Sequence, residues 1–379
     1  MKFRKILSAL ALTTLLSFSS GCSDQNQVLT IESEQRNAIN KQADEILSKM
    51  TLEDKVGQIL WLGIHGSTYD DILKIVLETY KPGGIILSER SCESVDQVKQ
   101  LTRDLQQNSK YPLLIAIDEE GGKYNRAQNI IEPPPSQKEI GDSGNPELAK
   151  EWAIKNSKNL KELGINVNFA PVLDVGYNDP DGRCYSSDPE IVTKFAKSAI
   201  DGYASENFLC TLKHFPGIGH SVGEAELGLS DVHVPEKILK STDLLPFKEV
   251  TYNYPEETFF VMTSPAKYPS LDSDHSANVS KKIITDLLRN EMEYNGVVIT
   301  GNFDMAAVSQ TISFRDAGVQ SILAGCDVVF IVHSYEYGRE VYNGILDGVK
   351  SGKISEDRIN ESVRRILRAK IYSNLFPKE

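Results

Sequence analysis

Carboxylates, a lysine and histidines stand at the ends of predicted strands, where they could meet around one polar ligand. Side chains of these types transfer protons and hold hydroxyl groups, and a carboxylate can also attack an electrophilic carbon. Some could instead cap the helices that follow, because Asp and Ser favour that position. As a set they exceed what capping requires, so we expect a polar pocket. The residues at these strand ends are Asp118, Glu119, Glu120, Asp174, Lys213, His214, Ser264, Gly301 and His333.

Such a pocket needs a scaffold that brings many strand ends together, and the sequence alternates short apolar runs with amphipathic stretches. Apolar strands separated by helices indicate a parallel sheet buried on both faces, and eight such units fit a single (β/α)₈ barrel. Barrel active sites lie where the carboxyl ends of the strands meet. The predicted strands are Gln58–Gly63, Gly84–Leu87, Leu113–Ile117, Asn166–Leu173, Thr211–Phe215, Phe259–Thr263, Gly296–Thr300 and Asp327–Val332. The clearest predicted helices are Val95–Gln107, Pro146–Leu163, Ile191–Ser205, Ser280–Glu293, Glu336–Val349 and Glu356–Tyr372.

Several local sequences resemble signature segments of glycoside hydrolase family 3. IDEEGGKYNR (117–126) is similar to the family's Ile-Asp-x-Glu-Gly-Gly-Arg-Val-x-Arg, and KHFPGIG (213–219) to its Lys-His-Phe-Pro-Gly-His-Gly. Further segments follow in family order: NVNFAPVLDV (166–175), GRCYSSDPEIV (182–192) and NVSKKIITDLLRNEMEYNGVVIT (278–300). The resemblance points to the single-domain, β-N-acetylhexosaminidase-like branch. It implies a barrel that hydrolyses O-glycosidic bonds of N-acetylglucosamine-containing glycans.

The resemblance also implies a retaining mechanism, in which an Asp attacks the anomeric carbon and a second group protonates the leaving oxygen. In this branch the proton donor is a His oriented by an Asp, on the loop after Lys-His-Phe-Pro-Gly. The positions that hold the sugar match in this chain at Asp118, Arg126, Arg183, Lys213 and His214. Alternatively, the two arginines could brace loops through ion pairs. We interpret His65, His233 and His333 as packing, capping or incidental residues.

The catalytic positions themselves are altered. Gly301 stands where the family has its nucleophile, and Glu224 and Glu226 align with the Asp and His of the acid/base pair. These two glutamates are weak acid/base candidates, because partial burial and a neighbouring carboxylate raise the pKa of a carboxyl group. Ile218 replaces the second His of the signature. Asp304 lies three residues beyond the nucleophile position, and a misplacement of roughly 1 Å can cost about a hundredfold in rate.

Three functions are therefore open. The first is an active or weakly active β-N-acetylhexosaminidase-like hydrolase, which the family signatures favour and Gly301 argues against. The second is a pseudoenzyme that binds a saccharide or a protein partner, which the altered positions favour. The third is an altered hydrolysis in which Glu226 activates water directly. Restoring an Asp at position 301 would test whether the loss is local.

The first residues have the pattern of an export signal. Lys2, Arg4 and Lys5 precede the apolar run Ile6–Leu16, which is too short to span a membrane, and Ser-Ser-Gly-Cys ends at Cys22. This pattern resembles a bacterial lipobox, so we expect residues 1–21 to be removed, Cys22 to be lipidated and the protein to be anchored in the cell envelope. Simple signal-peptide cleavage is the alternative. Residues 23–45 are polar and predict a tether, which leaves residues 46–379 for the barrel.

Charge and cysteine spacing limit the possible partners. The formal net charge is −12, and removing residues 1–21 with their three positive charges makes it −15. A surface this acidic repels nucleic acid, so we expect a saccharide, either a peptidoglycan fragment or a chitin-type amino sugar. No Cys-x-x-Cys spacing occurs, and we expect neither a metal nor a cofactor. The sequence leaves open whether Cys92, Cys184, Cys210 and Cys326 pair.

Overall fold

A closed parallel barrel forms the centre of the protein, as the sequence predicts. The computed structural model describes residues 23–64, 66–221, 231–303 and 312–376, with side chains from residue 34 onward. Eight parallel strands lie in the order β11-β8-β7-β6-β3-β2-β1-β12. A parallel bridge between Ile299 and Val328 joins the first and last strands of this order, β11 and β12, and so closes the barrel. The strands are β1 (Leu60–Gly63), β2 (Gly84–Leu87), β3 (Leu114–Ile117), β6 (Val167–Asn168), β7 (Leu209–Phe215), β8 (Phe259–Thr263), β11 (Val298–Ile299) and β12 (Val329–Ile331).

The strand boundaries depart from the predicted ones where neighbouring elements compete for residues. β2 and β8 coincide with their predicted runs. β1 starts at Leu60 because Gln58 and Ile59 complete helix α2 (Leu52–Ile59), which begins with a capping box at Thr51. β6 is short, but its chain pairs with β7 again at Val172.

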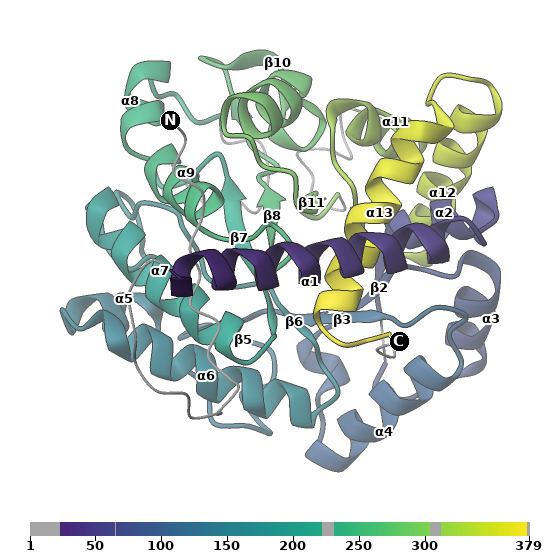
Figure 1. Cartoon of the computed structure of the whole chain (residues 1–379), viewed down its shortest axis with the longest axis horizontal. Helices are drawn as coiled ribbons and strands as arrows, with labels where there is room; N and C mark the ends of the chain where they lie inside the picture. Colours follow the sequence, from purple (N-terminus) through teal and green to yellow (C-terminus); the bar gives the residue numbers. More distant parts are fainter. Residues whose placement is uncertain (1–22, 65, 222–230, 304–311, 377–379) are drawn as a thin grey trace.

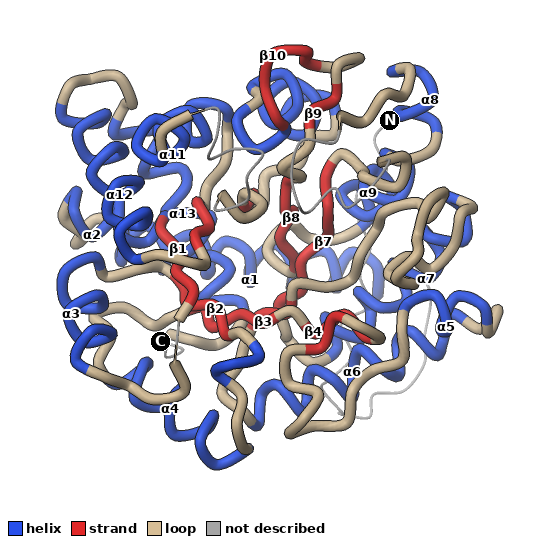
Figure 2. The backbone as a smooth tube through the Cα atoms, turned by 180° about the vertical axis from the view of Figure 1, so that it is seen from behind, coloured by secondary structure: helices blue, strands red, loops and turns tan. Residues whose placement is uncertain are grey.

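Helices surround the strands on all sides (Figure 2). They are α3 (Asp71–Tyr80), α4 (Val95–Gln107), α5 (Gln137–Asp142), α6 (Pro146–Glu162), α7 (Pro189–Ser205), α8 (Glu236–Ser241), α9 (Leu244–Asn253), the π-helix η4 (Lys282–Glu291), α11 (Phe314–Ala324), α12 (Tyr335–Lys350) and α13 (Glu356–Tyr372). Short 3₁₀ turns η1 (Glu89–Ser91) and η3 (Ala277–Val279) and the two-stranded pairs β4 (Glu119–Gly121) with β5 (Tyr124–Asn125) and β9 (Lys267–Tyr268) with β10 (Asp272–Ser276) complete the described elements.

The residues expected to form a tether belong to a helix instead. Helix α1 (Ser23–Leu47) crosses one end of the barrel and lies next to α13 (Figure 1). Ile39, Ala43 and Leu47 recur every fourth residue and are buried, so they form an apolar stripe on one side of α1. At the same end, Arg36 pairs with Glu257 at 3.3 Å. The prediction of a tether over 23–45 is therefore wrong for the part of this segment whose side chains are described.

Aromatic rings fill the inside of the barrel. Trp61 lies 5.8 Å from Phe260 and 6.4 Å from Phe169, measured between ring centroids, and Phe169 lies 5.5 Å from Phe330. All four rings are buried. The barrel is therefore a packed core rather than a channel, and Phe169 and Phe330 form the floor of the pocket above it.

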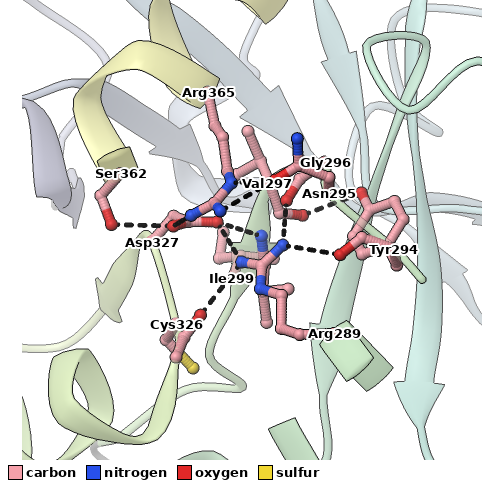
Figure 3. Close-up of polar contacts among 12 residues, drawn as sticks. Arg289, Tyr294, Asn295, Gly296, Val297, Ile299, Cys326, Asp327, Ser362 and Arg365 are labelled. Atoms are coloured by element: carbon pink, nitrogen blue, oxygen red, sulfur yellow. Dashed lines mark hydrogen bonds and ion pairs between the residues drawn. The ribbon is translucent and has the colours of Figure 1, made fainter. Parts of the chain in front are cut away.

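A buried carboxylate stabilises the junction of β11 and β12, which is called the barrel seam below (Figure 3). Asp327 accepts a hydrogen bond from the backbone N–H of Val298 at 2.9 Å, and pairs with Arg289 at 2.5 Å and Arg365 at 3.0 Å. Burial opposes the charge, but the guanidinium groups outweigh it and lower the pKa of Asp327 to about 2. The side chain of Asp327 thus connects the barrel seam with η4 and α13.

The predictions about membrane spans, the N-terminal segment and cysteine pairing have different outcomes. No described helix is long and apolar enough to cross a membrane. The signal peptide and Cys22 lie outside the described residues. Cys92, Cys184, Cys210 and Cys326 are buried and form no disulfide with one another.

Candidate functional site

A cavity of about 760 Å³ opens at the carboxyl ends of the strands, at the opposite end of the barrel from α1. This volume suits a small-molecule ligand. The cavity brings together Asp118, Arg126, Arg183, Lys213, His214 and Gly301. Its other lining residues include Ser88, Glu89, Arg90, Glu120, Tyr124, Phe169, Ile218, Met262, Pro265, Asn302, Phe330, Val332 and His333. Glu224, Glu226 and Asp304, the remaining acid/base and nucleophile candidates, lie outside the described residues.

Lys213 is the centre of an ion-paired cluster on one wall of the pocket. It ends β7, and its ammonium lies 2.7 Å from Asp118 Oδ1 and 2.5 Å from Glu120 Oε1. Burial lowers the pKa of Lys213, but the two carboxylates outweigh this effect and raise it. Burial likewise opposes ionisation of Glu120, but Arg183 and Lys213 hold its pKa well below the usual range. Lys213 and Glu120 are therefore both charged at neutral pH, and the cluster presents fixed charges to a ligand.

Arg183 forms an ion pair and also lines the pocket. Its guanidinium forms a bidentate ion pair with Glu120, with Nε 2.9 Å from Oε2 and Nη2 2.8 Å from Oε1. It also stacks on Tyr124, 4.2 Å from the centre of the ring. It also lines the pocket, so bracing and ligand contact are compatible. Arg126 lies over the same ring at 5.8 Å and forms no ion pair with a described carboxylate. The loop-bracing alternative therefore finds no support in the described contacts of Arg126.

His214 is oriented by Asp174, which stands beyond the end of β6. The imidazole Nδ1 lies 2.8 Å from Asp174 Oδ2, while Asp174 Oδ1 accepts a hydrogen bond from the backbone N–H of Ile218 at 2.9 Å. A carboxylate at Nδ1 places the proton on that nitrogen and fixes the ring in the pocket wall. Asp174 and Glu120 are thus supporting residues of the site, and their place at strand ends beside the predicted residues is the sequence signal for them.

Gly301, which the sequence resemblance aligns with the family's nucleophile, lies in a closely packed position. Gly301 donates its backbone N–H to Asn278 Oδ1 at 2.9 Å, and the same oxygen accepts a hydrogen bond from Thr263 Oγ1 at 2.7 Å. A Cβ at position 301 would lie 2.8 Å from the carbonyl oxygen of Thr263 and 3.2 Å from Pro265 Cδ. Residue 301 therefore cannot carry a side chain unless the backbone moves.

On this side of the pocket, the described residues next to Gly301 carry a carboxamide and an imidazole. Asn302 follows β11 and His333 follows β12, and their side chains approach within 3.5 Å. His333 lines the pocket, so the interpretation of this residue as packing or capping is incomplete. Ile218 lines the pocket where the signature has a histidine. By contrast, His233 is absent from the lining, and its side chain is 75% exposed.

The closed barrel and the polar pocket at its mouth place the chain among (β/α)₈ proteins with a polar pocket at the carboxyl ends of their strands. The family model for the glycosyl hydrolase family 3 N terminal domain matches residues 51–369. The chain therefore belongs to glycosyl hydrolase family 3.

Its relatives are β-hexosaminidase-like. Beta-hexosaminidase A from Pseudoalteromonas piscicida is 30% identical over 335 residues, covering 79% of this chain and 54% of the relative. An uncharacterized secreted glycosyl hydrolase from Arthroderma benhamiae is 31% identical, covering 82% of this chain and 91% of the relative. The family 3 β-N-acetylglucosaminidase structure from Paenibacillus sp. has a TM-score of 0.81 and 33% identity, covering 86% of this chain and 63% of that one. The chain thus spans only about half to two thirds of the first and third of these proteins.

Proposed function

We propose that this protein holds an N-acetylglucosamine-containing glycan at the barrel mouth and does not cleave it by the family's retaining route. The observation that carries this proposal is Gly301 at the end of β11. Glycine offers no carboxylate to form the glycosyl-enzyme, whereas Asp118, Lys213 and Arg183 take part in the ion pairs of the opposite pocket wall. The pocket has kept groups that bind hydroxyls and lost the group that reacts.

The size of the catalytic loss supports a binding function. Each factor of ten in rate corresponds to about 1.4 kcal/mol of transition-state stabilisation, and removal of a nucleophile costs many such factors. Asn302 and His333, which are next to the empty position, do not replace an ionised carboxylate as nucleophile. Residual turnover at a useful rate would require a different mechanism.

Calorimetry combined with a turnover assay tests the proposal. The full chain, purified in detergent, would be titrated with chitooligosaccharides and with muropeptides, and assayed with a chromogenic β-N-acetylglucosaminide. We expect saturable binding of at least one saccharide and no release of chromophore above a heat-denatured control. Lys213→Met should abolish binding, while His233→Ala, an exposed position outside the pocket, should leave it unchanged. Absence of binding to any of these saccharides would overturn the proposal.

We also propose that the protein is exported and anchored to the cell envelope by a lipid on Cys22. The basic and apolar N-terminal pattern supports this, and α1, which follows Cys22, lies at the end of the barrel opposite the pocket. Metabolic labelling with a radioactive fatty acid should label the wild-type chain, and Cys22→Ala should lose the label. An unlabelled wild-type chain would contradict the anchor.

A further inference from the structure

The two sides of the pocket carry different kinds of chemical group. Around the barrel, β3 and β6 stand opposite β11 and β12 in the strand order. The ion-pairing residues of one wall are Asp118, directly after β3, Lys213 on β7, and Arg183 in the loop after β6. Across the pocket, Gly301, Asn302 and His333 offer a backbone, a carboxamide and an imidazole. A sugar held by the first group would therefore meet a carboxamide and an imidazole among the described residues on its other side.

The stereochemistry of retaining hydrolysis determines which face of the sugar would lie toward Gly301. In a retaining enzyme that acts on β-glycosides, the nucleophile attacks the anomeric carbon from the face opposite the leaving oxygen, which is the α face. A nucleophile in reacting position lies about 3–3.5 Å from that carbon and so excludes an axial oxygen there. Gly301 has no side chain at this position, and Asn278 already accepts its backbone N–H. Among the described residues, no carboxylate therefore stands where it would exclude an α-anomeric oxygen.

We infer that the pocket selects N-acetylhexosamines in the α-anomeric form, with the axial C1 oxygen toward Asn302 and His333. This inference rests on the proposed function and names the ligand class of the same site. A carboxamide can donate or accept a hydrogen bond, and an imidazole can do both through its two nitrogens, so either residue suits a hydroxyl or an ether oxygen. The two side chains approach each other within 3.5 Å, close enough to address one oxygen atom together. Asn302 and His333 would thus determine anomeric specificity rather than catalyse a reaction.

Methyl α- and methyl β-N-acetylglucosaminide are suitable probes because neither interconverts in solution. Titration calorimetry with the full chain in detergent should give about tenfold tighter binding of the α-glycoside, as expected for one or two additional hydrogen bonds. Asn302→Ala and His333→Gln should each reduce this ratio by a few fold, chiefly by weakening the binding of the α-glycoside. Thermal unfolding of each variant would verify that it folds. His233→Ala and Asn108→Ala, at exposed positions outside the pocket, are matched controls that should keep the ratio.

The outcomes separate this inference from the proposed function. Equal affinities, or tighter binding of the β-glycoside, would overturn the anomeric selection while leaving saccharide binding in place. An α preference that both variants retain would also overturn the role of Asn302 and His333. If neither glycoside binds, and chitooligosaccharides and muropeptides do not bind either, the inference and the proposed function both fail.

Discussion

At residue 301 the backbone itself is part of the packing. Asn278 connects Gly301 with Thr263, and the carbonyl oxygen of Thr263 occupies the direction in which a side chain would leave the backbone. Introducing a nucleophile here is therefore not a local repair. An Asp at 301 must first displace β8 or β11, and its carboxylate would then stand away from the position that attack requires.

Substitution of Gly301 should consequently cost stability without restoring activity. We expect Gly301→Ala and Gly301→Asp to lower the free energy of unfolding by about 1–3 kcal/mol, because overpacked positions force backbone shifts of this cost. Urea denaturation measures the effect. Gly66→Ala is a matched control, since a Cβ at residue 66 meets nothing within 4 Å. β-N-Acetylglucosaminidase activity in Gly301→Asp at unchanged stability would contradict this account.

Glu119 is a buried acid behind the pocket wall. Its Oε2 accepts a hydrogen bond from the backbone N–H of Ala127 at 2.9 Å, while Oε1 has no hydrogen-bond partner among the described residues. Burial raises the pKa of Glu119 from 4.5 to about 7. Between pH 4.5 and about 7, the folded state therefore keeps a proton on Glu119 that the unfolded state has lost. The free energy of unfolding consequently falls as the pH rises through this window.

Glu119→Gln should remove this pH dependence. For wild type we expect a loss on the order of 3 kcal/mol as the pH rises from about 4.5 to about 8, and a flatter profile for the variant. Denaturant unfolding at several pH values measures both. Glu162→Gln, at an exposed glutamate, should follow wild type. Parallel profiles of Glu119→Gln and wild type would show that Glu119 is ionised in the folded protein.

The sequence predicts the members of the site better than their arrangement. Asp118, Lys213 and His214 could be found because each follows an apolar run within a family signature. The contacts of Glu120 and Asp174 with them could not, because they join residues that are distant along the chain. The close packing at Gly301 was likewise invisible, since it depends on the carbonyl oxygen of Thr263.

Among the elements, α1 shows where composition misleads. The segment is mostly polar, so it resembles a tether, yet a narrow stripe of apolar residues is enough to attach a helix to the barrel end. By contrast, α4, α13, β2 and β8 have the bounds that the sequence predicts, because their apolar spacing is unambiguous.

A charge on the inner side of α1 should destabilise the whole protein. Ala43 is fully buried, so Ala43→Asp would bury an unpaired carboxylate. We expect a loss of at least about 3 kcal/mol in the free energy of unfolding, comparable with a broken buried ion pair. Lys41→Asp, at a side chain that is 77% exposed, is the control and should have little effect. Equal stability of the two variants would mean that α1 is a tether after all.

The Asp327 cluster should be the strongest polar support of the barrel seam. Asp327→Asn leaves several guanidinium groups without their buried anion, and such a loss costs about 3–5 kcal/mol. Asp347→Asn, which breaks an exposed pair with Arg315, should cost at most about 1 kcal/mol. Because the folded pKa of Asp327 is lowered from 3.8 to about 2, its stabilisation is present above pH 4 and is lost as the pH falls through this range. Similar losses for the two variants in urea denaturation would contradict this assignment.

At the scale of the whole molecule, the pocket and α1 occupy opposite ends of the barrel. An anchor at Cys22, as proposed, would leave the pocket directed away from the membrane and open to glycans of the envelope. The barrel itself could be predicted because eight strand–helix units repeat along the chain. The ligand could not, because it depends on the shape of a pocket assembled from distant strand ends.

We propose that this family 3 barrel binds its sugar and does not cut it. One measurement tests both halves: titration of the full chain with a chromogenic β-N-acetylglucosaminide, following heat and released chromophore in the same sample. We predict saturable binding that Lys213→Met abolishes, with chromophore release no faster than in a heat-denatured control. Release proportional to the concentration of folded protein would contradict the proposal, and so would the absence of binding heat with this glycoside, with chitooligosaccharides and with muropeptides.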